Sequence, residues 1–342
     1  MVYTFELIKH PNVHYRDAVV SLSRCELLSM LRALKAECPV EAETLGGSPF
    51  LVFECRELSS RELAYLSGHS SVSFMAERVR GPLLRPLDVP SASYLPEDLP
   101  EILKYKGKTS VPFTRMMINT AAALTAWALS PGKMTFFDPV CGRGTGCFCA
   151  LCAGMDAVGL DQSSRDLKEA SDYFARYLKY GRMKHQVRSR SETVRKTAVQ
   201  VTEFTFADTK EHYQAGETRR LTFACADTSL SPALFRRTPA HVIAADLPYG
   251  IQHAPRADRK PETLTGFLKR ALPAWKQSLV PGGAIALSYN TLTLPDRAVL
   301  DAVRSAGLIP AEESWMSGLS HEVEQAVVRN VIFAVNPEEE TT

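Results

Sequence analysis

The sequence has no apolar run long enough to span a bilayer, and its 342 residues contain no internal repeat. Its first residues lack the basic start and apolar core of a secretory leader, because Glu6 and Lys9 interrupt the opening apolar stretch. The eight cysteines do not have the regular spacing of a disulfide-rich domain. We therefore expect an ordinary globular protein of the reducing cytoplasm.

Net charge is also small, at +2, but it is distributed unevenly. Residues 1–105 carry 11 Lys and Arg against 14 Asp and Glu, whereas residues 106–220 carry 18 against 11. The remaining residues, 221–342, carry 11 against 13. A basic excess confined to the middle of the chain indicates where a phosphate-bearing partner would approach.

Hydrophobic periodicity and turn residues divide the chain into four parts. We expect a small α+β domain at 1–81, a linker rich in Pro and Ser at 82–104, a larger domain at 105–337 and an acidic tail at 338–342. In the small domain, the predicted strands are Val2–Lys9, Phe50–Cys55 and Val72–Val79, and the predicted helices are Ser23–Ala36 and Ser59–Leu66. Because it holds no catalytic constellation, its expected role is substrate positioning or subunit contact.

The larger domain has the alternating rhythm of a parallel sheet covered on both faces, an α/β Rossmann-like fold. Its first elements are a strand over Met134–Phe137, a helix over Gly146–Ala153, a strand over Ala157–Leu160 and a helix over Ser164–Tyr180. Further predicted strands are Leu221–Ala224, His241–Ala245, Gly283–Tyr289 and Val327–Val335. Such a sheet binds its ligands beyond the carboxyl ends of the strands.

The first motif that carries chemistry is Asp138-Pro139-Val140-Cys141-Gly142-Arg143-Gly144-Thr145. Gly142 and Gly144 follow a strand and open a helix, which is the setting in which a G-x-G pair brings the backbone close to a ligand. No third spaced glycine follows Thr145, and this argues against a dinucleotide such as NAD.

Carboxylates follow three of the predicted strands. Asp138 is placed to hold a ligand's ammonium group, and Asp161, with Gln162 beside it, is placed to accept from ribose hydroxyls about twenty residues further on. Asp227, next to Thr228, is a candidate acceptor for the amino group of adenine. Each aspartate alone could be a helix N-cap. Three of them at the ends of successive strands favour a binding site.

The second motif is Asp246-Leu247-Pro248-Tyr249-Gly250, again directly after a predicted strand. Asp246 and the carbonyl beside Pro248 could accept hydrogen bonds from a planar amine, and Pro248 stiffens the turn. Tyr249 offers a flat face for a base taken out of its stack. The alternative is a plain loop with a core tyrosine.

Four cysteines lie near the first motif, and Cys149-Ala150-Leu151-Cys152 forms a C-x-x-C. A zinc site needs a second pair of ligands at matching spacing, which the neighbouring sequence does not supply. Small apolar cysteines also suit a helix that packs on a sheet. We therefore predict no metal site.

On these motifs, residues 105–337 resemble the nucleic-acid amino-methyltransferases that use S-adenosylmethionine (SAM), and among them the tRNA guanine-N2 methyltransferases often associated with a THUMP domain. The resemblance implies a class I methyltransferase fold and SAM as cofactor. It implies cofactor contacts from Pro139, Cys141, Thr145 and Phe113, the last in a segment, 106–115, that covers the cofactor in that family. Leu247 replaces the proline of the general pattern, which favours the RNA guanine branch.

Residues 176–196 carry eight Lys and Arg against one Glu, and four aromatic residues at 173–180 precede or overlap this stretch. Basic groups follow phosphates and aromatic rings stack on bases, so we expect RNA, most simply tRNA, to bind here. A solvated helix whose aromatic rings pack inward is an equal alternative. Residues 201–207 and 220–226 could form a hairpin that extends the same face.

The sequence thus predicts a methyltransferase acting on guanine N2 of tRNA or another structured RNA. Adenine N6 and protein glutamine remain alternatives, because the same clamp serves any planar amine or amide. A catalytically silent RNA-binding subunit with this fold is a further alternative.

Overall fold

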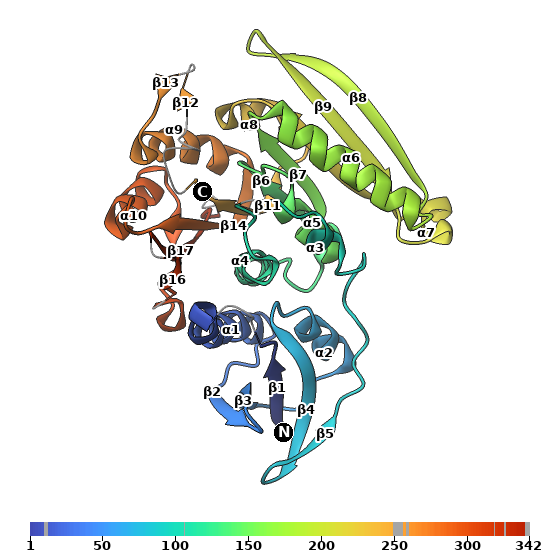
Figure 1. Cartoon of the computed structure of the whole chain (residues 1–342), viewed down its shortest axis with the longest axis vertical. Helices are drawn as coiled ribbons and strands as arrows, with labels where there is room; N and C mark the ends of the chain where they lie inside the picture. The colour runs from blue at the N-terminus through green and yellow to red at the C-terminus, as the bar shows by residue number, and fades with distance from the viewer. Residues whose placement is uncertain are drawn as a thin grey trace.

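The computed structural model describes residues 1–9, 13–105, 107–248, 256–257, 260–317, 319–324 and 326–338. Two main sheets lie one above the other in Figure 1, a small antiparallel sheet near the N-terminus and a large, mostly parallel one. A two-stranded ribbon pairs β12 (Arg256–Ala257) with β13 (Lys260–Pro261). No helix in the described part of the chain is long and apolar enough to cross a membrane.

The small sheet contains five strands in the order β2-β3-β1-β4-β5. The strands are β1 (Val2–Leu7), β2 (Val40–Leu45), β3 (Ser48–Glu54), β4 (Val72–Arg80) and β5 (Leu83–Pro86). Its helices are α1 (Val13–Ala33) and α2 (Ser60–Ser67). The α+β character matches the prediction for this region.

Two elements of the small domain were not predicted from the sequence. β2 pairs with β3 through Gly46 and Gly47, both at positive φ, and only Val40 of its six residues is buried, so β2 lacks a continuous apolar pattern. β5 lies in the stretch expected as a linker and pairs with β4 beyond Gly81. The short helix α3 (Leu99–Ile102) lies in the same stretch.

The large sheet has the strand order β15-β17-β14-β11-β6-β7-β10-β9-β8, with β16 paired to β17. β14, β11, β6, β7 and β10 run parallel, and β17 is antiparallel to β14 and to β15. The strands are β6 (Thr135–Asp138), β7 (Asp156–Asp161), β8 (His185–Val194), β9 (Thr197–Phe206), β10 (Arg219–Cys225), β11 (Ala240–Asp246), β14 (Leu279–Asn290), β15 (Ile309–Pro310), β16 (His321–Glu324) and β17 (Val327–Val335). This order confirms the predicted Rossmann-like sheet of class I methyltransferases.

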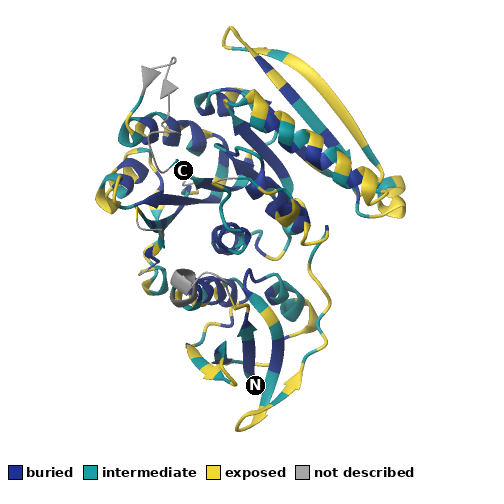
Figure 2. Cartoon of the chain, in the orientation of Figure 1, coloured by how far each residue is buried: buried dark blue, intermediate teal, exposed yellow. Residues whose placement is uncertain are grey.

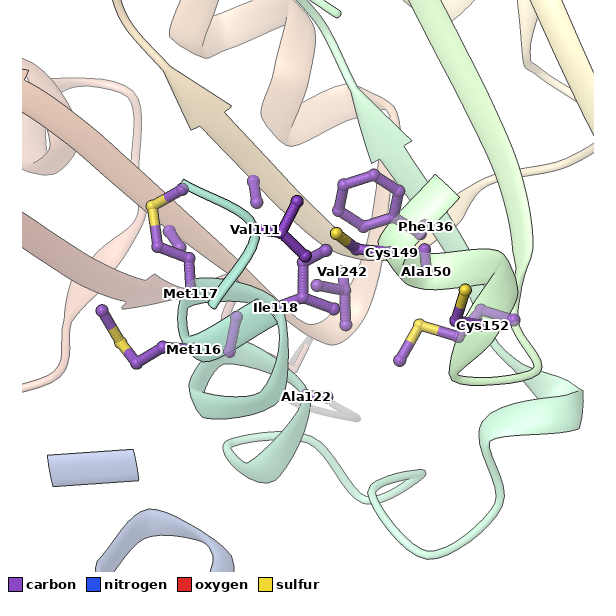
Figure 3. Close-up of a cluster of buried hydrophobic side chains, with 14 of the residues drawn as sticks. Val111, Met116, Met117, Ile118, Ala122, Phe136, Cys149, Ala150, Cys152 and Val242 are labelled. Atoms are coloured by element: carbon purple, nitrogen blue, oxygen red, sulfur yellow. The ribbon is translucent and has the colours of Figure 1, made fainter. Parts of the chain in front are cut away.

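Both faces of this sheet are covered. Successive side chains along a strand point to opposite faces, and each face has its own hydrophobic core. Phe136 and Val242 pack under α4 and α5, as Figure 3 shows, whereas Phe137 and Ile243 pack in a second core with Trp275. The first face carries α4 (Val111–Ala123), α5 (Thr145–Cys152) and α6 (Ser164–Tyr180). The second carries α9 (Leu264–Gln277) and α10 (Asp296–Ser305).

A long hairpin of β8 and β9 extends one edge of the sheet and is exposed over most of β8 (Figure 2). Its turn places Arg195 and Lys196 at φ of 47° and 66°. Two successive positive φ values match the twist of a tight hairpin, although glycine or asparagine usually supplies them. The predicted pairing of the 201–207 and 220–226 segments is confirmed, since β9 is antiparallel to β10, with α7 (Lys210–Ala215) between them.

Candidate active site

Four aspartates meet at the carboxyl edge of four adjacent strands. Asp246, Asp138 and Asp161 are the last residues of β11, β6 and β7, and Asp227 follows β10 by two residues. The strands lie side by side in this order, so the residues that the sequence singled out share one edge of the sheet. Parallel strands bind ligands at this edge.

The turn after β6 is tied to the end of β7 by hydrogen bonds. Gly142 donates its N–H to Asp161 Oδ2 at 2.8 Å, and Ser163 donates its N–H to Asp161 Oδ1 at 2.8 Å. Gly144 has φ of 81° and caps α5, a conformation that suits glycine. Burial of Asp161 raises its pKa despite these donors. Asp161 therefore orders the turn, whether or not it also contacts a ligand.

Asp138 is buried, with 9% exposure, and only one described group, the N–H of Val140 at 3.2 Å, donates to its side chain. A Cβ on Gly146 would lie 2.6 Å from Asp138 Oδ2, so glycine is needed for the close approach of α5. Burial raises the pKa of Asp138 to about 8, and repulsion from Asp161 and Asp246 adds to the rise. The site thus contains a buried carboxyl group surrounded by negative charge.

Asp227 is held more completely than Asp138. Its Oδ1 accepts from the Ser229 N–H at 2.9 Å and from Arg270 at 2.6 Å, and its Oδ2 accepts from Gln162 at 2.7 Å. Burial favours the neutral acid, but the Ser229 hydrogen bonds and the Arg270 charge outweigh it and lower the pKa of Asp227. Asp227 caps the following 3₁₀ turn, so it has the N-cap role that the sequence left open.

Thr228 and Cys141 are both buried. Thr228 accepts a hydrogen bond from Trp275 Nε1 at 2.7 Å, which directs its side chain into the core of the second face. Cys141 is 6% exposed, and burial raises the pKa of its thiol. Contact with a cofactor through the side chain of Thr228 would compete with the Trp275 hydrogen bond.

All four cysteines near the turn are free and buried. These cysteines are Cys141, Cys147, Cys149 and Cys152. In the described part of the chain, no group of three or more His, Cys, Asp or Glu residues is arranged to hold a metal ion. Burial raises the pKa of the Cys149 thiol to about 12, so this thiol is protonated at neutral pH.

The second motif begins at the end of β11. Leu247 is buried and donates its N–H to Ser288 O at 2.9 Å, which fixes the turn to β14. Thr109 donates its hydroxyl to Asp246 Oδ2, and Arg329 Nη2 lies 3.9 Å from the same oxygen. Pro248 follows in the described chain, whereas Tyr249 and Gly250 lie outside the described residues.

Phe113, predicted to contact the cofactor, is buried beside the second motif. The Arg329 guanidinium carbon lies 4.5 Å from the centre of its ring, and the His321 ring centre lies 5.5 Å away. Its exposure is 2%. In this structure Phe113 supports Arg329, which in turn faces Asp246.

Sequence reasoning missed three residues that contact one or the other of the two motifs. Tyr105 shares a hydrogen bond of 2.7 Å with Thr145 Oγ1, and the Arg143 guanidinium carbon lies 4.8 Å from the centre of its ring. Thr109 and Arg329 contact Asp246. The 106–115 segment was noted as a whole, but nothing in its spacing distinguished Thr109, and Arg329 is a single charge within an apolar strand.

The eight basic residues of 176–196 are all exposed. They lie at the end of α6, on β8 and at the tip of the hairpin (Figure 2), at Arg176, Lys179, Arg182, Lys184, Arg188, Arg190, Arg195 and Lys196. Among them, only Arg190 forms an ion pair with a described residue. Tyr173 and Phe174 pack inward and Tyr177 donates to Asp98, while Tyr180 is 92% exposed.

No family model matches this chain, and no curated protein matches it. Among solved structures, it is similar to TrmN from Thermus thermophilus, with 17% identity over 86% of this chain and 59% of that chain and a TM-score of 0.39. It is similar to an rRNA methylase from Streptococcus thermophilus, with 11% identity over 68% of this chain and 100% of that chain and a TM-score of 0.35.

A third similar structure is magnesium protoporphyrin IX methyltransferase (ChlM) from Synechocystis PCC 6803 with bound SAM. It has 13% identity over 67% of this chain and 86% of that chain, with a TM-score of 0.36. This chain spans 59% of the length of the Thermus protein, so the match does not extend over that whole protein. These likenesses concern the fold, and the fold assignment itself rests on the strand order of the large sheet.

Proposed function

We propose that this protein is a SAM-dependent methyltransferase that modifies an exocyclic base amine, and that its substrate is guanine N2 of tRNA or another structured RNA. The observation that carries the proposal is the electrostatic character of the strand edge. Asp138 is buried beside Asp161 and Asp246, without a cationic partner among the described residues. A buried carboxyl group among like charges favours a cationic ligand.

The residues present fit SAM, which carries an ammonium group and a positively charged sulfur. Asp138 would hold the ammonium group, and the protein backbone of the turn at Gly142 would pass close to the ligand. Asp161 and Gln162 would face the ribose hydroxyls. Asp227 has both oxygens engaged by protein donors, so it would contact adenine through its remaining lone pairs. When bound, SAM supplies an electrophilic methyl group.

Asp246 provides the chemistry toward the acceptor. Its carboxylate can accept a hydrogen bond from the amine and so make the nitrogen lone pair more available. Thr109 and Arg329 contact Oδ2 and fix the direction of the carboxylate. Methyl transfer forms the N–C bond, breaks the S–C bond and releases one amine proton, which Asp246 can accept. Positioning accounts for most of the rate enhancement in such a displacement.

The exposed basic surface of 176–196 supports RNA as the substrate. Seven of its eight cations have no carboxylate within ion-pair distance among the described residues, so they are available to phosphates. Tyr180 adds an exposed aromatic ring. The choice of guanine N2 follows from the Asp246-Leu247-Pro248-Tyr249 motif and its resemblance to the tRNA guanine-N2 enzymes. We place the activity in the cytoplasm, because the eight cysteines lack the regular spacing of a disulfide-rich domain.

The test is methyl transfer from radiolabelled SAM to total tRNA, genomic DNA and a release-factor protein. We expect tRNA to be labelled, and mass spectrometry of its nucleosides to identify N2-methylguanosine. Labelling of adenine N6 or of the protein would replace the proposed acceptor. Calorimetry should detect binding of SAM and not of NAD.

Asp246→Ala separates an enzyme from a silent RNA-binding subunit. We expect transfer to fall by at least ~100-fold with SAM and tRNA affinities retained, because the carboxylate acts on the reacting nitrogen. Asp301→Ala, at an exposed position of α10, serves as the matched control. Unchanged transfer in Asp246→Ala would remove Asp246 from the mechanism.

A further inference from the structure

A cavity of about 500 Å³ lies between the small domain and the helices that cover the large sheet. Its lining includes side chains of α1, α2, α4 and α5, and these helices lie between the two sheets in Figure 1. Apolar lining residues include Met30, Leu34, Ile118, Ala122 and Met155. Figure 3 shows Ile118 and Ala122 on α4 beside Cys149 and Cys152 of α5, which also line the cavity. This volume is typical of a small-molecule site at a domain interface.

One wall of the cavity is polar and firmly fixed. Asn119 donates its amide nitrogen to Glu26 Oε1 at 2.7 Å and to Gly68 O at 2.9 Å. These two acceptors settle the orientation of the amide, so Oδ1 is its acceptor atom. No described residue donates to Asn119 Oδ1. The cavity therefore offers an ordered hydrogen-bond acceptor.

The second polar group is Tyr65, which also lines the cavity. Burial raises the pKa of its hydroxyl, and the negative charge of Glu26 raises it further, so the hydroxyl is protonated. Its oxygen neither donates to nor accepts from any residue in the described part of the chain. Tyr65 and Asn119 both line the cavity, so the cavity presents a hydroxyl donor as well as an amide acceptor.

The charges around the cavity disfavour an anionic head group at this wall. Glu26 is fully buried, and its partners are the neutral Ser70 and Asn119 together with His69. Arg115 is neutralised by Glu97 at 3.1 Å. Arg61, at the exposed rim, donates to Leu129 O at 3.2 Å and has no ion pair with a described residue. An anion could place its charge there, in solvent, and would leave Tyr65 and Asn119 unbonded.

We propose that this interdomain cavity is a binding site for a neutral small molecule with an apolar body and one hydroxyl or amide group. The polar group donates to Asn119 Oδ1 and accepts from the Tyr65 hydroxyl, while the apolar body fills the space under Ile118 and Ala122. This site lies on α4 and α5 away from the strand edge that carries Asp138 and Asp246, and it does not depend on the proposed methyl transfer.

The test uses 1-octanol as a neutral probe and octanoate as its anionic counterpart, with the full chain. We expect octanol to raise the midpoint of thermal unfolding in a saturable way and octanoate to raise it much less. No shift with octanol, or an equal shift with octanoate, would overturn the proposal. The absence of an octanol shift would show that the cavity does not bind the probe. An equal shift with octanoate would show that Tyr65 and Asn119 do not select a neutral ligand over an anionic one.

Two variants locate the binding. Ala122→Trp fills the cavity and should abolish the octanol shift, while its circular dichroism spectrum verifies folding. Tyr65→Phe removes one hydroxyl and should weaken octanol binding about fivefold. Tyr180→Phe is the matched control, because Tyr180 is 92% exposed on α6. An octanol shift that persists unchanged in both Ala122→Trp and Tyr65→Phe would place the probe elsewhere and contradict the proposal.

Discussion

At the residue scale, two carboxyl groups on adjacent strands have different surroundings. Asp138 is buried with one backbone donor, and its pKa is raised to about 8. Asp246 accepts a hydrogen bond from Thr109 and lies near Arg329, and both contacts orient its carboxylate. Different environments for two neighbouring acids are a common way to divide their roles. In the proposed mechanism, Asp138 binds the cation and Asp246 acts on the acceptor amine.

The raised pKa of Asp138 predicts that SAM binding releases a proton. At pH 6 the free carboxyl group is protonated, since its pKa is about 8, and the α-amino group of SAM is already charged. A bound ammonium group favours the carboxylate and lowers its pKa, so about one proton should leave. SAM affinity should accordingly increase as the pH rises toward 8. Calorimetry in buffers of different ionisation enthalpy measures this release.

Asp138→Asn should abolish most of this proton release, because the amide cannot titrate. Asp301→Asn, at an exposed position, should leave it unchanged. A wild-type protein that binds SAM without releasing a proton at pH 6 would show that Asp138 does not meet the ammonium group.

Thr109 is predicted to position Asp246. Thr109→Val keeps the shape of the side chain but removes the donor to Oδ2, so kcat/KM should fall about tenfold while SAM affinity changes less than about twofold. Thr109→Ser retains the hydroxyl and should retain most of the activity. Steady-state kinetics with tRNA and calorimetry with SAM make the comparison. Equal losses in Val and Ser would indicate a packing role instead.

At the element scale, the β8–β9 hairpin is an extension of the sheet edge beyond the common parallel core. Most side chains of β8 are exposed. The turn at the tip of the hairpin holds Arg195 and Lys196 at positive φ. An edge strand with charged residues resists pairing with other chains. The positive φ values of Arg195 and Lys196 are unfavourable for residues other than glycine. Binding of a polyanion by the hairpin would give this turn a function.

Replacement of Arg188, Arg195 and Lys196 by Gln should weaken tRNA binding by tenfold or more at about 0.1 M salt, because each phosphate contact contributes electrostatically. The slope of log K against log salt should become shallower by roughly 2 to 3. Filter binding at several salt concentrations measures both quantities.

The matched control keeps the charge by changing Arg188 and Arg195 to Lys, and should leave the salt slope unchanged. If the Gln variant binds tRNA with the wild-type affinity and salt slope, the RNA surface lies elsewhere.

At the scale of the whole molecule, the two sheets are joined through α1 and α4. Glu26 of α1 is fully buried and accepts from Asn119 of α4 and from Ser70 at the start of the β4 segment. His69 lies 3.5 Å from the same carboxylate. One carboxylate therefore connects three parts of the chain that are distant in sequence.

Glu26→Ala should lower the free energy of unfolding by about 3 kcal/mol, because buried donors of Asn119 and Ser70 lose their acceptor. Urea denaturation measures the change. Glu37→Ala, at an exposed position just after the helix, should change the free energy by less than about 0.5 kcal/mol. Similar small effects in both variants would show that water replaces the carboxylate.

The mostly parallel sheet and its covering helices could be predicted from the sequence alone, since apolar strands, helix periods and turn glycines are local patterns. α6 and β17 lie where they were predicted, and Asp138, Asp161, Asp227 and Asp246 lie at or just beyond the ends of their strands. The sequence also predicted the basic surface, because charge density requires no tertiary contacts. Elements with exposed or short patterns, such as β2 and β5, were not predicted.

Contacts between distant side chains could not be predicted from the sequence. The contact of Thr109 with Asp246 spans 137 residues, and that of Asn119 with Glu26 spans 93, so no local pattern encodes either. Burial raises the pKa of Asp138, and Phe113 packs against Arg329. The raised pKa and the packing contact both depend on which residues the fold places around Asp138 and Phe113. Local periodicity specifies the helices and strands. The burial of a side chain and its hydrogen-bond partners are set only when elements distant in sequence pack together.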